Sequence, residues 1–70
     1  MYRDEQRTMW PEYKGINVDK AIENIKKENP ELNVYKVATD EMVTMDYRTD
    51  RVRVYYDRNT NLVVTAPTIG

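Results

Sequence analysis

The stretch Arg51-Val52-Arg53-Val54-Tyr55-Tyr56 alternates between charged and apolar side chains over its first four residues. Successive side chains of an extended strand point to opposite faces, so the two valines share one face and the two arginines share the other. Valine and tyrosine are also favoured in strands. We therefore expect a β-strand at Arg51–Tyr56 with an apolar face toward the core and a polar face that carries both arginines.

The residues after this strand predict a hairpin. Residues 57–61 read DRNTN, a composition typical of a turn. Residues 62–64 read LVV and are apolar and partly β-branched, which predicts a short third strand. We expect this third strand to fold back and pair with the central strand.

Upstream, the sequence predicts one amphipathic helix. Its apolar residues fall at positions i, i+3, i+4 and i+7 and so share one stripe: Val18, Ala21, Ile22 and Ile25. Asn17 is a favourable N-cap, and Pro30 stops the helix because the residue before a proline avoids the helical region. We expect a helix at Val18–Glu28 whose apolar stripe packs on the valine face of the central strand.

A further strand is predicted at residues 32–37, LNVYKV, which are rich in apolar and β-branched side chains. The connection from there to the central strand is long enough for a crossover, so the two strands can pair in parallel. The expected fold class is α+β, with one α-helix packed on a small mixed β-sheet.

The chain length of 70 residues fits one small domain. Residues 1–9 show no periodic apolar pattern and predict a flexible N-terminal tail, so the domain is expected to span residues 10–70. No run of apolar residues is long enough to span a membrane. The absence of cysteine leaves the redox compartment open.

The composition excludes most enzyme classes. The chain has no histidine, serine or cysteine, so Ser-His and Cys-His nucleophile pairs cannot be built. Metal binding would depend on carboxylates alone, without the spacing of a calcium loop. With Gly15 and Gly70 as the two glycines, a glycine-rich phosphate loop is also excluded. We expect no enzymatic activity, no metal and no cofactor.

The connection at residues 38–50 is long for a compact domain and contains neither glycine nor proline. From Val43 to Arg48 its side chains alternate between apolar and polar, a pattern typical of an extended segment with two faces. Long connections in compact domains are usually functional or disordered. The alternative interpretation is that its apolar residues fill the core: Met42, Val43 and Met45.

Several motifs follow one another in a specific order along the chain. They are Trp10-Pro11-Glu12 followed by Gly15, the predicted helix, Val43-Thr44-Met45-Asp46-Tyr47-Arg48, Arg51-Val52-Arg53-Val54 and the terminal Pro67-Thr68-Ile69-Gly70. From Trp10 to Gly70, the chain resembles the potato type I serine-protease inhibitor family.

The resemblance implies a serine-protease inhibitor with a long exposed protease-binding loop that enters the protease cleft as a substrate does. On this sequence the loop comprises Met42, Val43, Thr44, Met45, Asp46, Tyr47 and Arg48, with Met45–Asp46 as the scissile bond. The apolar thioether of Met45 suits the primary pocket of chymotrypsin-like or subtilisin-like enzymes and offers no cation to a trypsin-type pocket. We expect a monomer with no nucleic-acid or membrane partner.

The family also implies support for this loop from two arginines, which Arg51 and Arg53 match. Their side chains would reach Thr44 and Asp46, with Gly70 close to the same cluster. A loop held rigid in this way loses its conformational entropy on folding and not on binding.

The amino side of the loop departs from the family pattern. Ala38 and Asp40 stand where relatives commonly have proline and glycine. Alanine leaves the chain freer than proline, and aspartate tolerates a positive φ less well than glycine. We therefore expect this side of the loop to be less stiff than in relatives.

Two functions of other classes remain open. Arginines interleaved with tyrosines could form a stacking and phosphate-binding surface for single-stranded nucleic acid: Arg48, Arg51, Arg53, Arg58, Tyr47, Tyr55 and Tyr56. The acidic residues Asp46, Asp50 and Asp57 within this set argue against it. A non-inhibitory protein-binding module on the same fold is the other alternative, because a fold does not determine a function.

Overall fold

The computed structural model describes residues 7–70. A short 3-10 helix at Pro11–Tyr13 precedes the helix α1 at Val18–Glu28. Three strands follow: β1 at Asn33–Ala38, β2 at Arg51–Tyr56 and β3 at Thr68–Ile69. The predicted α+β fold, with one helix packed on a small mixed sheet, is confirmed.

Helix α1 has the predicted bounds, and local sequence signals explain both of its ends. The Oδ1 atom of Asn17 accepts hydrogen bonds from the N–H groups of Asp19 and Lys20, at 2.9 and 3.1 Å, which confirms the N-cap. The predicted apolar stripe faces the core, with Ile22 half-buried and three residues fully buried: Val18, Ala21 and Ile25.

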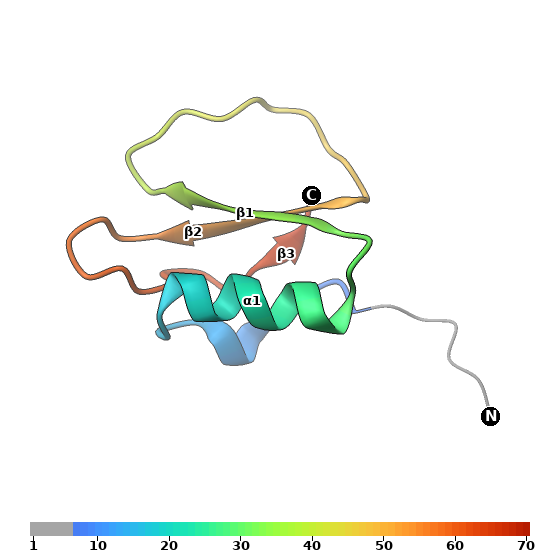
Figure 1. Ribbon diagram of the computed structural model, residues 1–70. Coiled ribbons are helices and arrows are strands. Elements are labelled where there is room, and N and C mark those ends of the chain that lie inside the picture. The colour runs from blue at the N-terminus through green and yellow to red at the C-terminus, as the bar shows by residue number, and fades with distance from the viewer. Residues whose placement is uncertain (1–6) are drawn as a thin grey trace.

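The sheet has the strand order β1-β2-β3. β1 and β2 are parallel, as predicted, and their register places Asn33 beside Arg51 and Ala38 beside Tyr56. β2 has the predicted bounds, whereas β1 begins and ends one residue later than predicted. Because the two strands are parallel, the connection between them must run from one end of the sheet back to the other (Figure 1).

The prediction of a third strand at residues 62–64 is wrong. The hairpin begins as expected, because the Asp57 N–H donates to the Leu62 carbonyl and Val63 forms a single bridge with Tyr56. The N–H and C=O of Val63 then bond to Ile16 and Gly15, at 2.8 Å each, instead of extending a ladder with β2. After one more hydrogen bond to β2, from the Val64 N–H to the Tyr55 carbonyl at 2.9 Å, the chain next pairs with β2 at Thr68–Ile69, which forms the antiparallel β3.

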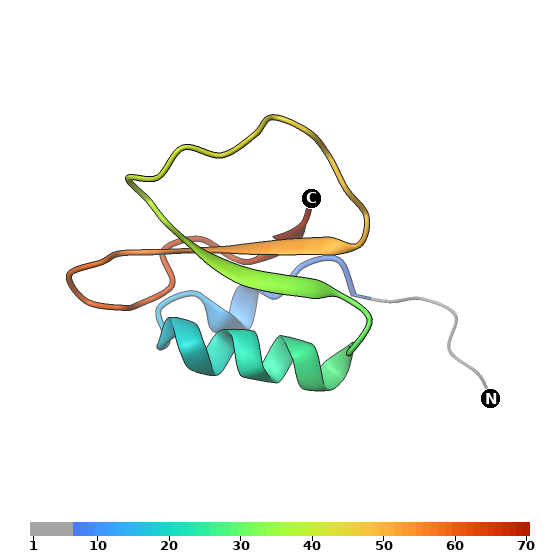
Figure 2. The ribbon, with the colours of Figure 1, turned by 45° about the horizontal axis from the view of Figure 1, so that its top comes forward.

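The core lies between α1 and one face of the sheet. Figures 1 and 2 show α1 on one side of the sheet, while residues 39–50 arch over the other side. The valines of β2 are fully buried on the helix side, as their alternation with arginines predicted. The buried apolar cluster is formed by Trp10, Val18, Ala21, Ile25, Leu32, Val34, Ala38, Val52, Val54, Tyr56 and Val63.

Thr8 and Met9, just before Trp10, pair with residues near the end of the chain. The carbonyl of Thr8 accepts from the Ile69 N–H at 3.0 Å, and Met9 forms a bridge with Thr68. Backbone pairing therefore extends two residues into the predicted N-terminal tail. The rest of that predicted tail, residues 1–6, lies outside the described residues.

Candidate functional site

The connection at residues 39–50 presents two methionines to solvent. The exposed fractions of Met42 and Met45 are 97% and 98%, and that of Tyr47 is 71%. Val43 is half-buried. The alternative in which both methionines fill the core is therefore wrong, and their apolar side chains are available to a partner.

Arg51 ties the middle of this connection to the end of the chain. Its side chain is 8% exposed and lies at the start of β2. The Nη2 atom donates to the main-chain carbonyl of Asp46 at 2.7 Å, and the Nε atom donates to the carbonyl oxygen of Gly70 at 2.8 Å. The Nη1 atom also lies 3.3 Å from the Asp46 carboxylate. One guanidinium thus fixes both the backbone and the side chain of a single loop residue.

Arg53, two residues further along the same face of β2, holds the preceding part of the connection. Its Nη1 and Nη2 atoms donate to the carbonyl and the hydroxyl of Thr44, at 3.1 and 3.0 Å. Its Nη2 atom lies 3.5 Å from the Asp46 carboxylate. The Arg53 Nε is buried without a hydrogen-bond partner among the described residues, a cost that the two bonds to Thr44 offset.

Thr44 and Asp46 are also bonded to each other, because the Thr44 hydroxyl donates to the Asp46 carboxylate. This hydrogen bond, followed by a backbone hydrogen bond and then by Arg51, lowers the pKa of Asp46 from 3.8 to about 2. Asp46 is therefore ionised at neutral pH and accepts from both partners. Its two neighbours in the sequence, Met45 and Tyr47, point away into solvent.

The carboxyl end of the connection has its own polar contacts. Arg48 pairs with Asp50 through two hydrogen bonds of 3.0 and 3.1 Å. The Nδ2 atom of Asn33, on β1, donates to the Asp50 carboxylate at 3.2 Å, and the Asn33 N–H donates to the Asp50 carbonyl at 2.8 Å. The hydrogen bond from Arg48 lowers the pKa of Asp50.

The amino end is held by an arginine from a different part of the chain. Arg58, in the turn after β2, places its Nε atom 3.0 and 3.2 Å from the two carboxylate oxygens of Asp40. Its Nη2 atom lies 3.3 Å from the Glu41 carboxylate. The hydrogen bond to Asp40 is the main reason why the pKa of Arg58 is raised.

Asp40 adopts an ordinary backbone conformation. Within residues 7–70, a positive φ occurs at Asn61 (62°) and Gly15 (91°), and Asp40 is not among these residues. A glycine at this position would therefore relieve no backbone strain.

The cluster around the centre of the loop was predicted only through the family resemblance: Arg51, Arg53, Thr44, Asp46 and Gly70. The contacts at the two ends of the connection were not predicted from the sequence: those of Asn33, Asp40, Glu41 and Arg58. A signal for Arg58 was present in the predicted topology. Parallel strands end at the same edge of a sheet, so the residues after β1 and those after β2 must be neighbours.

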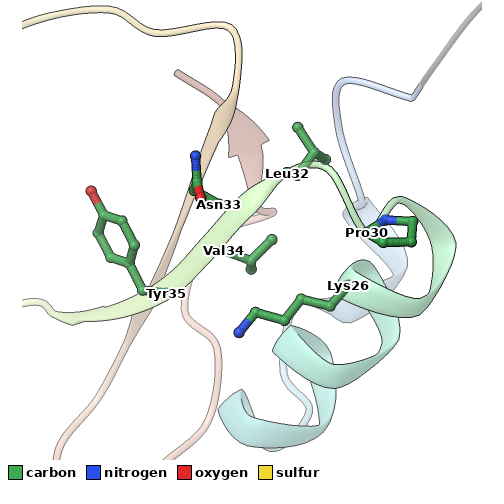
Figure 3. A pocket seen from close by; sticks show the side chains of 6 residues that line it. All are labelled: Lys26, Pro30, Leu32, Asn33, Val34 and Tyr35. Atoms are coloured by element: carbon green, nitrogen blue, oxygen red, sulfur yellow. The ribbon is translucent and has the colours of Figure 1, made fainter.

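A shallow, open pocket of about 480 Å³ lies elsewhere, where the end of α1 meets β1 (Figure 3). Figure 3 shows Lys26 reaching toward β1 from the helix, while Tyr35 lies on the other side of the strand. The pocket contains none of the predicted loop or support residues: it is lined by Lys26, Pro30, Leu32, Asn33, Val34 and Tyr35.

Two other kinds of site are absent from the described part of the chain. Residues 7–70 hold no cluster of three or more acidic side chains arranged to bind a metal ion. Their one α-helix also lacks the length and apolarity that a membrane span requires.

Comparisons with known proteins agree on one family. The Potato inhibitor I family matches residues 2–70. The chain is 38% identical over 65 residues to subtilisin inhibitor CLSI-I of Canavalia lineata, which covers 93% of this chain and 97% of that protein. It is 39% identical over 61 residues to eglin C of Hirudo medicinalis, which covers 87% of each.

The fold comparison leads to the same result. The crystal structure of bitter gourd trypsin inhibitor matches with a TM-score of 0.87 and 32% identity, covering 99% of this chain and 100% of that chain. The resemblance inferred from the order of the motifs is thus confirmed. The chain belongs to the potato inhibitor I family, whose members inhibit serine proteases.

Proposed function

We propose that this chain inhibits chymotrypsin-like or subtilisin-like serine proteases by presenting residues 42–48 as a rigid, substrate-like loop. Met45–Asp46 is the scissile bond, and Met45 enters the primary specificity pocket. One observation carries the proposal: Met45 is 98% exposed, while Thr44 and Asp46 on either side of it are hydrogen-bonded to Arg53 and Arg51. The loop thus exposes the Met45 side chain on a backbone that Arg51 and Arg53 hold in place.

The order of the loop in the free protein increases its affinity for the protease, because less conformational entropy is lost on binding. Fixing one residue's backbone costs about 1–2 kcal/mol, and a nanomolar inhibitor needs about −12 kcal/mol in total. A loop of several residues that is already ordered in the free protein avoids much of that cost at binding. Burial of the exposed Met45 side chain then contributes roughly 1.5–3 kcal/mol.

The same rigidity accounts for inhibition in place of digestion. After cleavage, the new amine of Asp46 would stay beside the acyl-enzyme, because Arg51 holds the backbone of that residue. Religation of the peptide bond then competes with water at a high effective concentration. The protease would release the cleaved form slowly and re-form the intact inhibitor.

The choice of target enzyme rests on Met45. Relatives are named as inhibitors of subtilisin, of subtilisin and chymotrypsin, and of trypsin, so the family alone does not select one protease. An apolar, flexible thioether fits a deep apolar pocket. It provides no cation for a pocket that contains a carboxylate.

The alternatives are less well supported. Members of this family are protease inhibitors and not enzymes, in line with the catalytic side chains that the sequence lacks. The four arginines that could have bound nucleic acid pair with carboxylates of the same chain: Arg48, Arg51, Arg53 and Arg58. We propose a monomeric inhibitor with no nucleic-acid or membrane partner.

The test is a titration of chymotrypsin, subtilisin and trypsin with the purified chain and a chromogenic peptide substrate for each enzyme. We expect stoichiometric inhibition of chymotrypsin or subtilisin and weak inhibition of trypsin. Equal inhibition of trypsin would show that Met45 is not the specificity residue. Failure to inhibit all three would remove the proposed mechanism and favour the non-inhibitory binding module.

A further inference from the structure

The amino end of the loop and the turn after β2 are neighbours because of the sheet topology. Ala38 and Tyr56 are partners at the last position of the parallel pair β1 and β2. The loop leaves the sheet directly after Ala38, and the turn leaves it directly after Tyr56, at the same end (Figure 1). The Thr39 N–H donates to the Tyr56 carbonyl at 3.0 Å and keeps the two segments together past the strand ends.

Residues 38–41, at the amino end of the loop, form a turn that is closed by two hydrogen bonds. The Glu41 N–H donates to the Ala38 carbonyl at 3.0 Å, and the Ala38 N–H donates to the Glu41 carboxylate at 3.3 Å. One oxygen of Glu41 is therefore used inside the turn. The other oxygen faces Arg58.

Arg58 stands on a turn that is braced by its own residues. The Asp57 side chain accepts from the Asn59 N–H at 2.7 Å, and the Asp57 carbonyl accepts from the Asn61 N–H at 2.7 Å. Asn61 adopts the positive φ that closes the turn, a conformation that asparagine tolerates better than most residues. The Arg58 guanidinium thus extends toward the loop from a turn that is itself held by hydrogen bonds.

We propose that Arg58 is a positioning residue for inhibition, which holds the amino-terminal end of the loop connection, residues 39–41, through Asp40 and Glu41. This inference rests on the proposed inhibitory function. Arg51 and Arg53 hold the centre of the loop, and Asn33 with Arg48 holds its carboxyl end. Arg58 completes this series at the amino end, where Ala38 does not restrict the backbone as a proline would.

The exposure of the three side chains determines how much the loss of Arg58 should weaken inhibition. The side chains of Arg58, Asp40 and Glu41 are 53%, 68% and 45% exposed, so each pair is screened by water and salt. Removal of Arg58 breaks two such pairs at once. We expect Arg58→Ala to weaken inhibition about three- to tenfold and to speed cleavage at Met45–Asp46 by a similar factor.

The experiment compares Arg58→Ala with Lys27→Ala, which removes another exposed cation from an ion pair, with Glu23 on α1 and away from the loop; the Lys27 and Arg58 side chains are 74% and 53% exposed. Inhibition constant, cleavage rate and melting temperature are measured for both. We expect similar melting temperatures, with weaker inhibition for the Arg58 variant alone. Arg58→Lys should restore part of the loss, and the difference between wild type and Arg58→Ala should shrink at about 0.5 M salt.

A double-mutant cycle identifies the partners. Glu41→Gln keeps an acceptor for the Ala38 N–H but removes the charge, and Asp40→Asn removes the other carboxylate. In this double background, Arg58→Ala should cause little further loss. An undiminished loss there, or an Arg58→Ala variant with unchanged inhibition and cleavage, would overturn the proposal.

Amide hydrogen exchange separates this result from a failure of the proposed function, because it needs no protease. In the free protein, the amides of residues 39–44 should exchange faster in Arg58→Ala than in wild type or Lys27→Ala. If wild type inhibits no protease but this difference is present, the loop is positioned as inferred and only the inhibitory function fails. Equal exchange in all three proteins would contradict the positioning role directly.

Discussion

Arg51 Nη2 donates a hydrogen bond of 2.7 Å to the main-chain carbonyl of Asp46, the first residue on the leaving-group side of the proposed scissile bond. The same guanidinium donates to Gly70 at 2.8 Å, so the leaving-group segment is tied both to the sheet and to the end of the chain. A cut at Met45–Asp46 would release no fragment and would leave the new amine in place. Because the hydrogen bond keeps the amine close to the acyl-enzyme, it favours religation of the peptide bond over hydrolysis.

The first prediction concerns the two central arginines. Arg53→Ala should weaken inhibition roughly ten- to a hundredfold, because charge-assisted bonds to Thr44 are lost, and Arg51→Ala should have a similar or smaller effect. Both variants should remain folded, since the buried valines of β2 face the other side of the sheet. Mass analysis after long incubation with catalytic chymotrypsin should show faster cleavage at Met45–Asp46 in the variants. Equal cleavage rates in wild type and variants would remove the supporting role of these residues.

The second prediction tests the specificity residue. Met45→Lys should shift the ratio of inhibition constants toward trypsin by about a hundredfold or more, because a cation then meets the pocket carboxylate. Met42→Lys is the matched control, because Met42 is as exposed as Met45 but lies three residues from the proposed scissile bond. A comparable shift in the Met42 variant would mean that the loop binds in a different register.

The third prediction concerns acid. The pKa of Asp46 is lowered from 3.8 to about 2, so the ionised carboxylate stabilises the folded loop at pH values above about 4, and this contribution is lost as the pH falls toward 2. A carboxyl carbon titration by NMR should place the Asp46 midpoint near 2. Thr44→Val should raise this midpoint, since the Thr44 hydroxyl is the largest cause of the shift. A wild-type midpoint near 4 would show that the hydrogen bond is not formed in solution.

The fourth prediction separates stability from function. Asn17→Ala removes the N-cap of α1 and should cost about 1 kcal/mol, which lowers the melting temperature of a domain of this size by about 5 °C. Inhibition should not change at temperatures where the variant is folded, because α1 lies on the opposite side of the sheet from the loop. Lys20→Ala, an exposed change in the same helix turn, should lower the melting temperature less than Asn17→Ala does.

The helix and the central strand could be predicted because their signals are local. Asn17 and Pro30 mark the ends of α1, and the alternation of valine with arginine defines β2. The third strand could not be predicted from local sequence. Thr68–Ile69 is two residues long and exists only because it pairs with β2, while the more apolar Val63 gives its backbone groups to Gly15 and Ile16.

For the site, the family resemblance supplied the pairing of Arg51 and Arg53 with the loop, whereas Arg58 was considered only as part of a nucleic-acid surface. Its partner Asp40 lies 18 residues away in the sequence, and no periodic pattern connects them. The contact becomes foreseeable only when the parallel register of β1 and β2 is combined with the charges that follow each strand.

The last prediction reverses an expectation taken from the family resemblance. A glycine at position 40 would favour the loop if that position needed a positive φ, but Asp40 has no positive φ and its carboxylate accepts two hydrogen bonds from Arg58. Asp40→Gly should therefore weaken inhibition about two- to fivefold, since it removes an ion pair and adds backbone freedom. Asp40→Asn, which removes the charge but keeps the backbone restriction, should show the ion-pair part of the loss alone. Tighter inhibition by the glycine variant would mean that the loop changes its backbone conformation at position 40 when it binds the protease.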